Sequence, residues 1–145
     1  MNSLRIRKYS DRIDIIEKRI SQIKEWTENL SPEDFEKNEL IKLAVYKAYQ
    51  EIIEASMDLV AMLCKDSGKM PKDDYANIET IASQGIIKRE IAVVLAEGNG
   101  LRNRIIHRYI SVDDKKAFIE INESLDVFED FVEMVERWIE ENLAK

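Results

Sequence analysis

The stretch FIEINESLDVFEDFVEMVERWI, residues 118–139, decides the fold because its apolar side chains recur at steps of seven. One row is formed by Phe118, Leu125, Val132 and Ile139, and a second by Ile121, Phe128 and Val135. Seven residues are close to two helical turns, so both rows lie on one side of an α-helix. The stretch therefore predicts a long amphipathic helix that buries one side against neighbouring helices.

The N-terminal segment carries the same pattern in two rows. They are Ile6, Ile13 and Ile20, and Tyr9, Ile16, Ile23 and Leu30. Helices with matching apolar rows pack side by side at a shallow crossing angle, as in helical bundles. The two ends of the chain therefore predict two long helices of one bundle.

The middle of the chain also has helical patterns, with turn signals between them. We expect a helix that starts at Ser31 and Pro32 and is interrupted near Asn38. Further helices are expected over residues 40–64, 74–83 and 86–97. Along residues 40–64 the expected inward face is Leu43, Ala44, Ala48, Ile52, Ala55, Leu59 and Leu63. The sequence predicts an all-α, up-and-down bundle of about five helices in a single domain spanning residues 1–145.

Composition narrows the class of protein. The chain of 145 residues is 45% hydrophobic and 35% charged, and its single cysteine, Cys64, cannot form an intramolecular disulfide. We therefore expect a cytoplasmic protein, and no apolar run reaches the roughly 20 residues of a membrane span. The formal net charge of −7 argues against a protein that coats nucleic acid over a broad basic face. A small local basic site remains possible.

The segment GLRNRIIHRY, residues 100–109, is such a local basic site. It holds the only histidine of the chain, His107, beside Arg102, Arg104 and Arg108. The preceding EGNG, residues 97–100, predicts a break or kink, with Asn99 capping a new helix that contains the segment. Positive side chains in a first helical turn oppose the helix dipole, so we expect this segment to bind an anion.

The residues of the segment limit the chemistry. The sequence contains no cluster at metal-ligand spacing, no Gly-rich phosphate loop and no serine nucleophile elbow. We therefore expect no metal and no cofactor. The chemistry that remains possible is acid–base catalysis by an imidazole, with arginines that stabilise a phosphate. Cleavage of RNA through its 2′-hydroxyl needs both a base and an acid. One histidine for each chain suffices only if a homodimer places two copies of the segment together. Capping of helix ends, or ion pairs on the surface, is the alternative explanation of the same residues.

RNRIIHRY, residues 102–109, resembles the Arg-x4-His-x-Tyr motif of HEPN-superfamily proteins, in particular the HepT-like toxins of toxin–antitoxin pairs. The likeness extends in the right order through YQEIIEASMDLVAMLC and PKDDYANIETIASQGII, and covers roughly residues 38–116. The resemblance implies a HEPN-type bundle that forms a homodimer. It also implies a metal-independent endoribonuclease toxin with its active site where two motifs meet.

The resemblance assigns roles to the residues of the motif. Arg102 and His107 correspond to the catalytic pair, with His107 transferring protons and Arg102 binding the scissile phosphate. Asn103 corresponds to the residue that orients the motif. Tyr109 corresponds to the tyrosine that a cognate minimal nucleotidyltransferase (MNT-type) antitoxin modifies with AMP. Arg104 and Arg108 are expected to contact the RNA backbone, or to form ion pairs with acidic helices.

A polar stripe on the helix over residues 40–64 has two explanations. Tyr46, Gln50, Glu54 and Asp58 recur at steps of four, as on a solvated face or on a polar wall facing a partner. The resemblance suggests that Glu54 or Asp58 lies near the motif, where a carboxylate could hold Arg102 or His107. Two other functions stay open for the whole chain: a non-catalytic HEPN subunit that binds nucleotide or substrate for a nucleotidyltransferase, and a plain helical dimerisation module.

Overall fold

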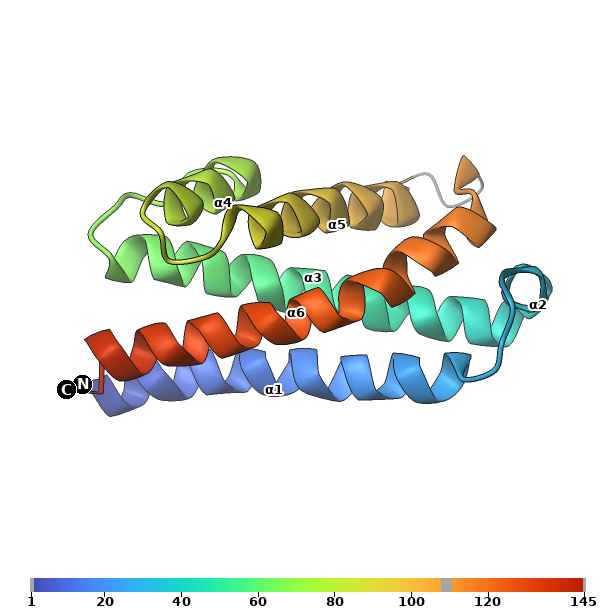
Figure 1. The fold of residues 1–145 in the computed structure, drawn as a ribbon, viewed down its shortest axis with the longest axis horizontal. Coiled ribbons are helices and arrows are strands. Elements are labelled where there is room, and N and C mark those ends of the chain that lie inside the picture. Colours follow the sequence, from blue (N-terminus) through green and yellow to red (C-terminus); the bar gives the residue numbers. More distant parts are fainter. Residues whose placement is uncertain (1, 108–110, 145) are drawn as a thin grey trace.

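The computed structural model describes residues 2–107 and 111–144, which form an all-α bundle (Figure 1). Its four long helices are α1 (Asn2–Thr27), α3 (Glu39–Asp66), α5 (Arg89–His107) and α6 (Asp114–Asn142). Two short helices, α2 (Pro32–Lys37) and α4 (Asp74–Ser83), lie between them in the chain. The described part thus has six helices against the five or so predicted, because α2 is an element of its own.

The long helices run up and down and surround one apolar core. Each of α1 and α5 packs against both α3 and α6. In Figure 1, α1 and α6 lie side by side along the bundle, and both chain termini are at one end. The predicted rows of α6 are buried from Phe118 to Ile139, and those of α1 are buried from Tyr9 to Ile23. The matching heptad rows therefore face the same core, as predicted.

The helix ends follow the signals in the sequence. Asn38 separates α2 from α3, and its side chain accepts a hydrogen bond of 3.0 Å from the Ile41 amide. Gly68, with a φ of 89°, follows the end of α3 in the left-handed conformation that glycine adopts without strain. Asp73 caps α4 and Asp113 caps α6. The predicted limits of α4 are confirmed, whereas α1 ends at Thr27, three residues before the predicted Leu30.

The expected inward face of α3 is wrong at Leu43, and Ala44 is only half-buried. Leu43 is 50% exposed, whereas Ala48, Ile52, Ala55, Leu59 and Leu63 are buried. Leu40, one turn earlier, is 80% exposed. Among the described residues, the other helices leave both leucine side chains largely uncovered. The beginning of α3 therefore presents an uncovered apolar surface.

Candidate functional site: the end of helix α5

The basic motif lies at the end of a continuous helix, which corrects the predicted break at EGNG. α5 runs without interruption from Arg89 to His107, through both Gly98 and Gly100. Arg104 and His107 are the basic residues of its last turn. The C-terminal end of a helix carries the negative pole of its dipole, so positive side chains are favoured there. The expectation that this segment binds an anion through a first helical turn is therefore wrong.

Gly98 has a packing role that explains why the helix continues. A Cβ at this position would lie 2.8 Å from both the Tyr49 hydroxyl oxygen and Ile53 Cδ1 of α3. Glycine thus lets α5 approach α3 closely, at the usual cost of about 1 kcal/mol in helix propensity. Packing in this place outweighs the local tendency of glycine to end a helix.

Asn99, predicted to cap a new helix, instead holds an arginine. Its side chain is 1% exposed, and its Oδ1 accepts a hydrogen bond of 2.7 Å from Arg102 Nη2. The two residues are three positions apart, which places them on one face of a continuous helix. Asn99 therefore fixes the direction of the Arg102 side chain.

Arg102 lies near carboxylates of two other helices. Its Nη1 lies 3.6 Å from Glu54 Oε2 of α3, and its Nη2 lies 3.7 Å from Asp74 Oδ2 of α4. The Arg102 side chain is 14% exposed, and its buried Nε has no hydrogen-bond partner among the described residues. A guanidinium group has five N–H donors, and within residues 2–107 and 111–144 only one of them makes a short hydrogen bond. Arg102 is thus oriented but keeps donors available for a ligand.

The other described motif residues lie around the same helix end. His107 and Arg104 are exposed, and Asn103 is half-buried. His107 follows Arg102 by five positions, which in a regular helix correspond to about 140° of rotation and about 7.5 Å of rise. Because α5 has no break, no bend brings these two side chains to one point. Arg108 and Tyr109 lie outside the described residues.

The predicted polar stripe of α3 divides into separate contacts. Glu54 accepts a hydrogen bond of 3.2 Å from Gln50 and faces Arg102, as the resemblance suggested. Asp58 instead pairs at 3.4 Å with Arg12 of α1. Tyr46 is buried and donates a hydrogen bond to Asp114 at the start of α6. Glu54 and Asp58 are exposed, Gln50 is half-buried and Tyr46 is buried, so the stripe is a solvated face with one polar group at the edge of the core, and not a continuous polar wall.

The sequence interpretation missed Asn99 and Asp74. Asn99 could have been found from its three-residue spacing to Arg102, had the helix been taken as continuous. The sequence around Asp74 does not indicate a role at the motif, because only the packing of α4 against α5 brings Asp74 near Arg102. Within residues 2–107 and 111–144, no group of three His, Cys, Asp or Glu side chains could hold a metal ion. No helix in the described part is long and apolar enough to cross a membrane.

Comparison with known proteins gives the family. The model of the "Ribonuclease HepT-like" family matches residues 16–135. The chain belongs to the HepT-like family. An Archaeoglobus fulgidus relative, named as a candidate RNase, is 33% identical to this HepT-like chain over 132 residues, which are 91% of this chain and 94% of the relative. The tRNA nuclease HepT of Aphanizomenon flos-aquae is 27% identical over 88% of this chain and 87% of its own.

A solved structure shows the same fold. The tri-AMPylated HEPN toxin of Shewanella oneidensis, in complex with its MNT antitoxin, matches with a TM-score of 0.83. The match covers 90% of this chain and 97% of that toxin at 19% identity. The HepT-like chain thus has the all-α fold of HEPN toxins, as the resemblance implied.

Proposed function

We propose that this HepT-like protein is a metal-independent endoribonuclease toxin. Its catalytic residues are Arg102 and His107, and its active site is completed by a second copy of the chain. Family membership supports RNA cleavage, as does the similarity to a protein named as a tRNA nuclease. The proposed substrate, cellular RNA, places the action of the toxin in the cytoplasm.

The observation that supports this proposal most strongly is the incomplete hydrogen bonding of the Arg102 guanidinium group. This guanidinium takes its direction from a hydrogen bond to Asn99 and lies near Glu54 and Asp74, and its buried Nε has no partner in the part of the chain that the structure describes. A purely structural arginine would satisfy its donors, because an unpaired buried donor is unfavourable. A phosphate oxygen would supply the missing acceptor and would be held in a fixed place. Such preorganised donors stabilise the charge that develops on a phosphate during cleavage.

The proposed reaction follows from these groups. The His107 imidazole of one chain takes the proton of the ribose 2′-hydroxyl, and the 2′-oxygen attacks the adjacent phosphorus. Arg102 binds the non-bridging oxygens as their charge increases. The bond from phosphorus to the 5′-oxygen then breaks, and the leaving oxygen receives a proton from the imidazolium of His107 in the second chain. The products are a 2′,3′-cyclic phosphate and a 5′-hydroxyl end.

The homodimer is required by the count and placement of these groups. One chain offers a single imidazole, and on a continuous helix it points about 140° away from Arg102. A two-fold axis near the end of α5 would bring two motifs together and supply both acid and base. Leu40, Leu43 and Ile106 are exposed apolar side chains of α3 and α5 that support an interface here.

The remaining motif residues have supporting roles in this proposal. Asn103 orients the motif, and Arg104 and Arg108 contact the RNA backbone. An MNT-type nucleotidyltransferase antitoxin neutralises the toxin by transferring AMP to Tyr109, as the description of the Shewanella complex supports. Tyr109 lies two residues after His107 in the sequence. A nucleotide attached there adds bulk and negative charge, which would exclude RNA from the cationic site.

The test is cleavage of a cellular RNA pool in the presence of EDTA. The protein is purified from cells that lack the antitoxin, and wild type is compared with His107→Ala and Arg102→Ala. Arg137→Ala, which removes an exposed arginine of α6 far along the chain from the motif, is the matched control. Wild type and the control should cut and leave 2′,3′-cyclic phosphate ends, whereas both motif variants should be inactive. Intact RNA with unmodified wild type would favour the non-catalytic HEPN subunit instead.

The dimer has a test of its own. Ile106→Asp places a charge on the proposed interface without removing a motif residue, and should convert the dimer to a monomer in light scattering after gel filtration. Cleavage should be lost together with the dimer. An excess of His107→Ala chains mixed with wild type should also inhibit cleavage by forming mixed dimers. A monomeric wild type that cuts RNA would contradict the shared site.

A further inference from the structure

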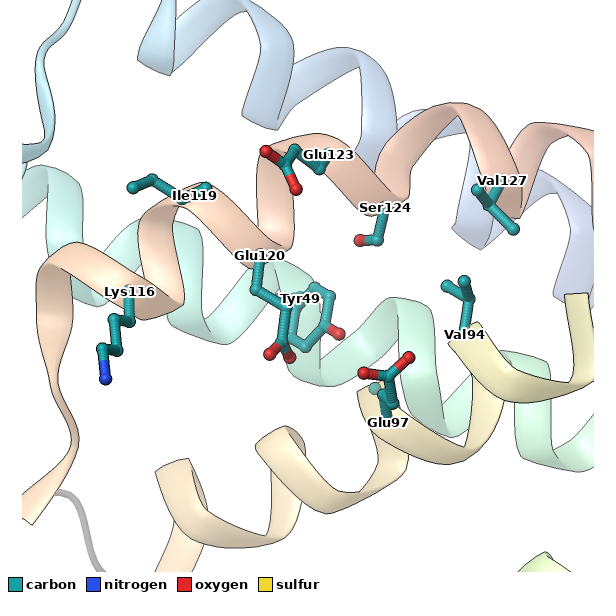
Figure 2. Close-up of a pocket in the computed structure, with 10 residues that line it drawn as sticks. Tyr49, Val94, Glu97, Lys116, Ile119, Glu120, Glu123, Ser124 and Val127 are labelled. Carbon is teal, nitrogen blue, oxygen red and sulfur yellow. The ribbon is translucent and has the colours of Figure 1, made fainter. Parts of the chain in front are cut away.

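A second feature of the molecule is a cavity between α3, α5 and α6, with a volume of about 520 Å³. Its lining includes Tyr49 from α3, Glu97 from α5 and Glu120 from α6 (Figure 2). None of the motif residues proposed for RNA cleavage lines it. Glu97 precedes Arg102 by five residues, so the two side chains leave α5 in directions about 140° apart. The cavity is therefore separate from the proposed catalytic pair, Arg102 and His107, although Arg104 is near enough to act on the Glu120 carboxyl.

Within the described part of the chain, two buried polar atoms at this cavity make no hydrogen bond of normal geometry, and Ser124 lies beside the first of them. They are the hydroxyl oxygen of Tyr49, whose side chain is 0% exposed, and Oε2 of Glu120. Tyr49 and Gly98 both line the cavity, and a Cβ on Gly98 would lie 2.8 Å from the Tyr49 hydroxyl oxygen. Buried polar atoms are nearly always paired in folded proteins, so both atoms point to a bound group that is polar itself.

The charge of the cavity lining indicates whether the bound group is positive or negative. Glu97, Glu120 and Glu123 contribute three carboxylates, against the single ammonium group of Lys116. Burial raises the pKa of the Glu120 carboxyl, and the nearby Glu97 raises it further, whereas Arg104 acts in the opposite direction. Figure 2 shows the Glu97 and Glu120 carboxylates on either side of the Tyr49 ring, with Lys116 apart from them. The cavity is thus suited to a cation that donates hydrogen bonds.

The rest of the lining is aliphatic. Val94 of α5, together with Ile119 and Val127 of α6, supplies apolar wall between the polar groups. A small inorganic cation would leave this wall without a contact, whereas a chain of methylene groups would cover it. The occupant should therefore carry ammonium groups joined by an aliphatic chain.

We propose that the cavity between α3, α5 and α6 binds a linear aliphatic polyamine. One ammonium group donates hydrogen bonds to Glu97 and Glu120 and to the Tyr49 hydroxyl oxygen. The methylene chain lies along Val94, Ile119 and Val127, and further ammonium groups offset the remaining negative charge of the lining. The site is formed within one chain, and binding does not require RNA.

Isothermal titration calorimetry with spermidine, without RNA and at physiological salt, tests this proposal. We expect saturable binding to one site for each chain. Tyr49→Phe removes only the unpaired hydroxyl and should raise Kd about 2- to 10-fold, as for a neutral hydrogen bond. Glu120→Gln removes a charged acceptor and should raise Kd about tenfold or more. Glu140→Gln removes the same charge from an exposed part of α6 and should leave Kd unchanged.

Tetramethylammonium chloride, which has positive charge but no N–H donor, should not compete with spermidine at equal ionic strength. Absence of saturable binding by the folded wild type would overturn the proposal. So would equal weakening by Glu120→Gln and Glu140→Gln, which would indicate diffuse attraction to an acidic surface. If Glu120→Gln does not fold, Tyr49→Phe still decides, since it keeps the ring and its packing. Because binding is measured without RNA, failure here does not bear on the proposed nuclease.

Discussion

Replacing Gly98 with alanine should destabilise the protein, although alanine is the better helix former. The added Cβ would lie 2.8 Å from the Tyr49 hydroxyl oxygen, 2.8 Å from Ile53 Cδ1 and 3.4 Å from Phe128 Cζ. Tyr49 and Ile53 are both 0% exposed, so moving either side chain disturbs its packing. The two closest contacts are shorter than real Cβ atoms show, so these side chains or α5 itself must shift.

The expected change in the free energy of unfolding is the sum of two opposing contributions. Overpacking a buried position by one methyl group costs about 2–3 kcal/mol when fully buried neighbours have to move. Replacing glycine by alanine within a helix returns about 1 kcal/mol. The net loss in the free energy of unfolding is about 1–2 kcal/mol, which corresponds to a decrease in Tm of roughly 3–6 °C for a chain of this size.

Gly100→Ala is the matched control in the same helix. A Cβ there would have ordinary contacts of 3.7 Å, with Arg104 Nη1 and with the Tyr75 hydroxyl oxygen. The helix term then acts alone, and stability should increase by about 0.5–1 kcal/mol. The two glycines, two positions apart, should thus respond with opposite signs.

Urea denaturation and differential scanning calorimetry of both variants measure the difference. A double variant, Gly98→Ala with Tyr49→Phe, should recover part of the loss, because the phenyl ring lacks one of the two clashing atoms. If Gly98→Ala were as stabilising as Gly100→Ala, the close approach of α5 to α3 would be refuted. The explanation of the continuous helix would fail with it.

Three further changes test single contacts. Asn99→Ala should lower kcat of RNA cleavage about tenfold by freeing Arg102, and Asn99→Asp, which keeps the acceptor, should restore most of it in the same kinetic assay. Burial raises the pKa of Glu120 in the folded state, so the folded protein binds the proton more tightly and loses stability as pH rises through that raised pKa. The Tm of Glu120→Gln minus the Tm of wild type should therefore increase from pH 4 to pH 7. A Tm difference that stays constant over this range would contradict this. Asp66→Ala removes the acceptor, at 2.7 Å, of the buried Tyr9 hydroxyl and should cost about 1–3 kcal/mol in urea denaturation, whereas an unchanged midpoint would exclude this role.

Local patterns were sufficient to predict most of the fold. The heptad rows of α1 and α6 identify buried faces because a helix that repeats every seven residues presents one side to its neighbours. The limits of α4 follow from Asp73, whose side chain accepts a hydrogen bond from the Ala76 amide, and from the turn at Gly85. Each of these signals involves residues close in sequence. Their meaning therefore does not depend on which other helix is adjacent.

The predicted helix break at EGNG was wrong because the deciding contacts are with residues distant in sequence. Glycine within a helix has two explanations, a helix end or a close contact, and residues on α3 decide between them. The sequence segment itself holds no information on Tyr49 and Ile53. The wrong break also reversed the expected helix polarity, which led to the mistaken expectation of an anion at a first turn. Leu43 shows the same limit, because its exposure depends on which helices pack against the beginning of α3.

The structure gives α5 two different faces, and Gly98 is the position that both depend on. One face carries Asn99 and Arg102 toward Glu54 and Asp74, and the other carries Glu97 toward the cavity beside Glu120. A larger residue than glycine would force Tyr49, Ile53 or α5 to shift, and a shift of α5 would displace Arg102 from Glu54 on α3. The same displacement would change the cavity that the Tyr49 hydroxyl enters. Close packing at a single glycine thus sets the geometry of the proposed nuclease motif and of the proposed polyamine site together.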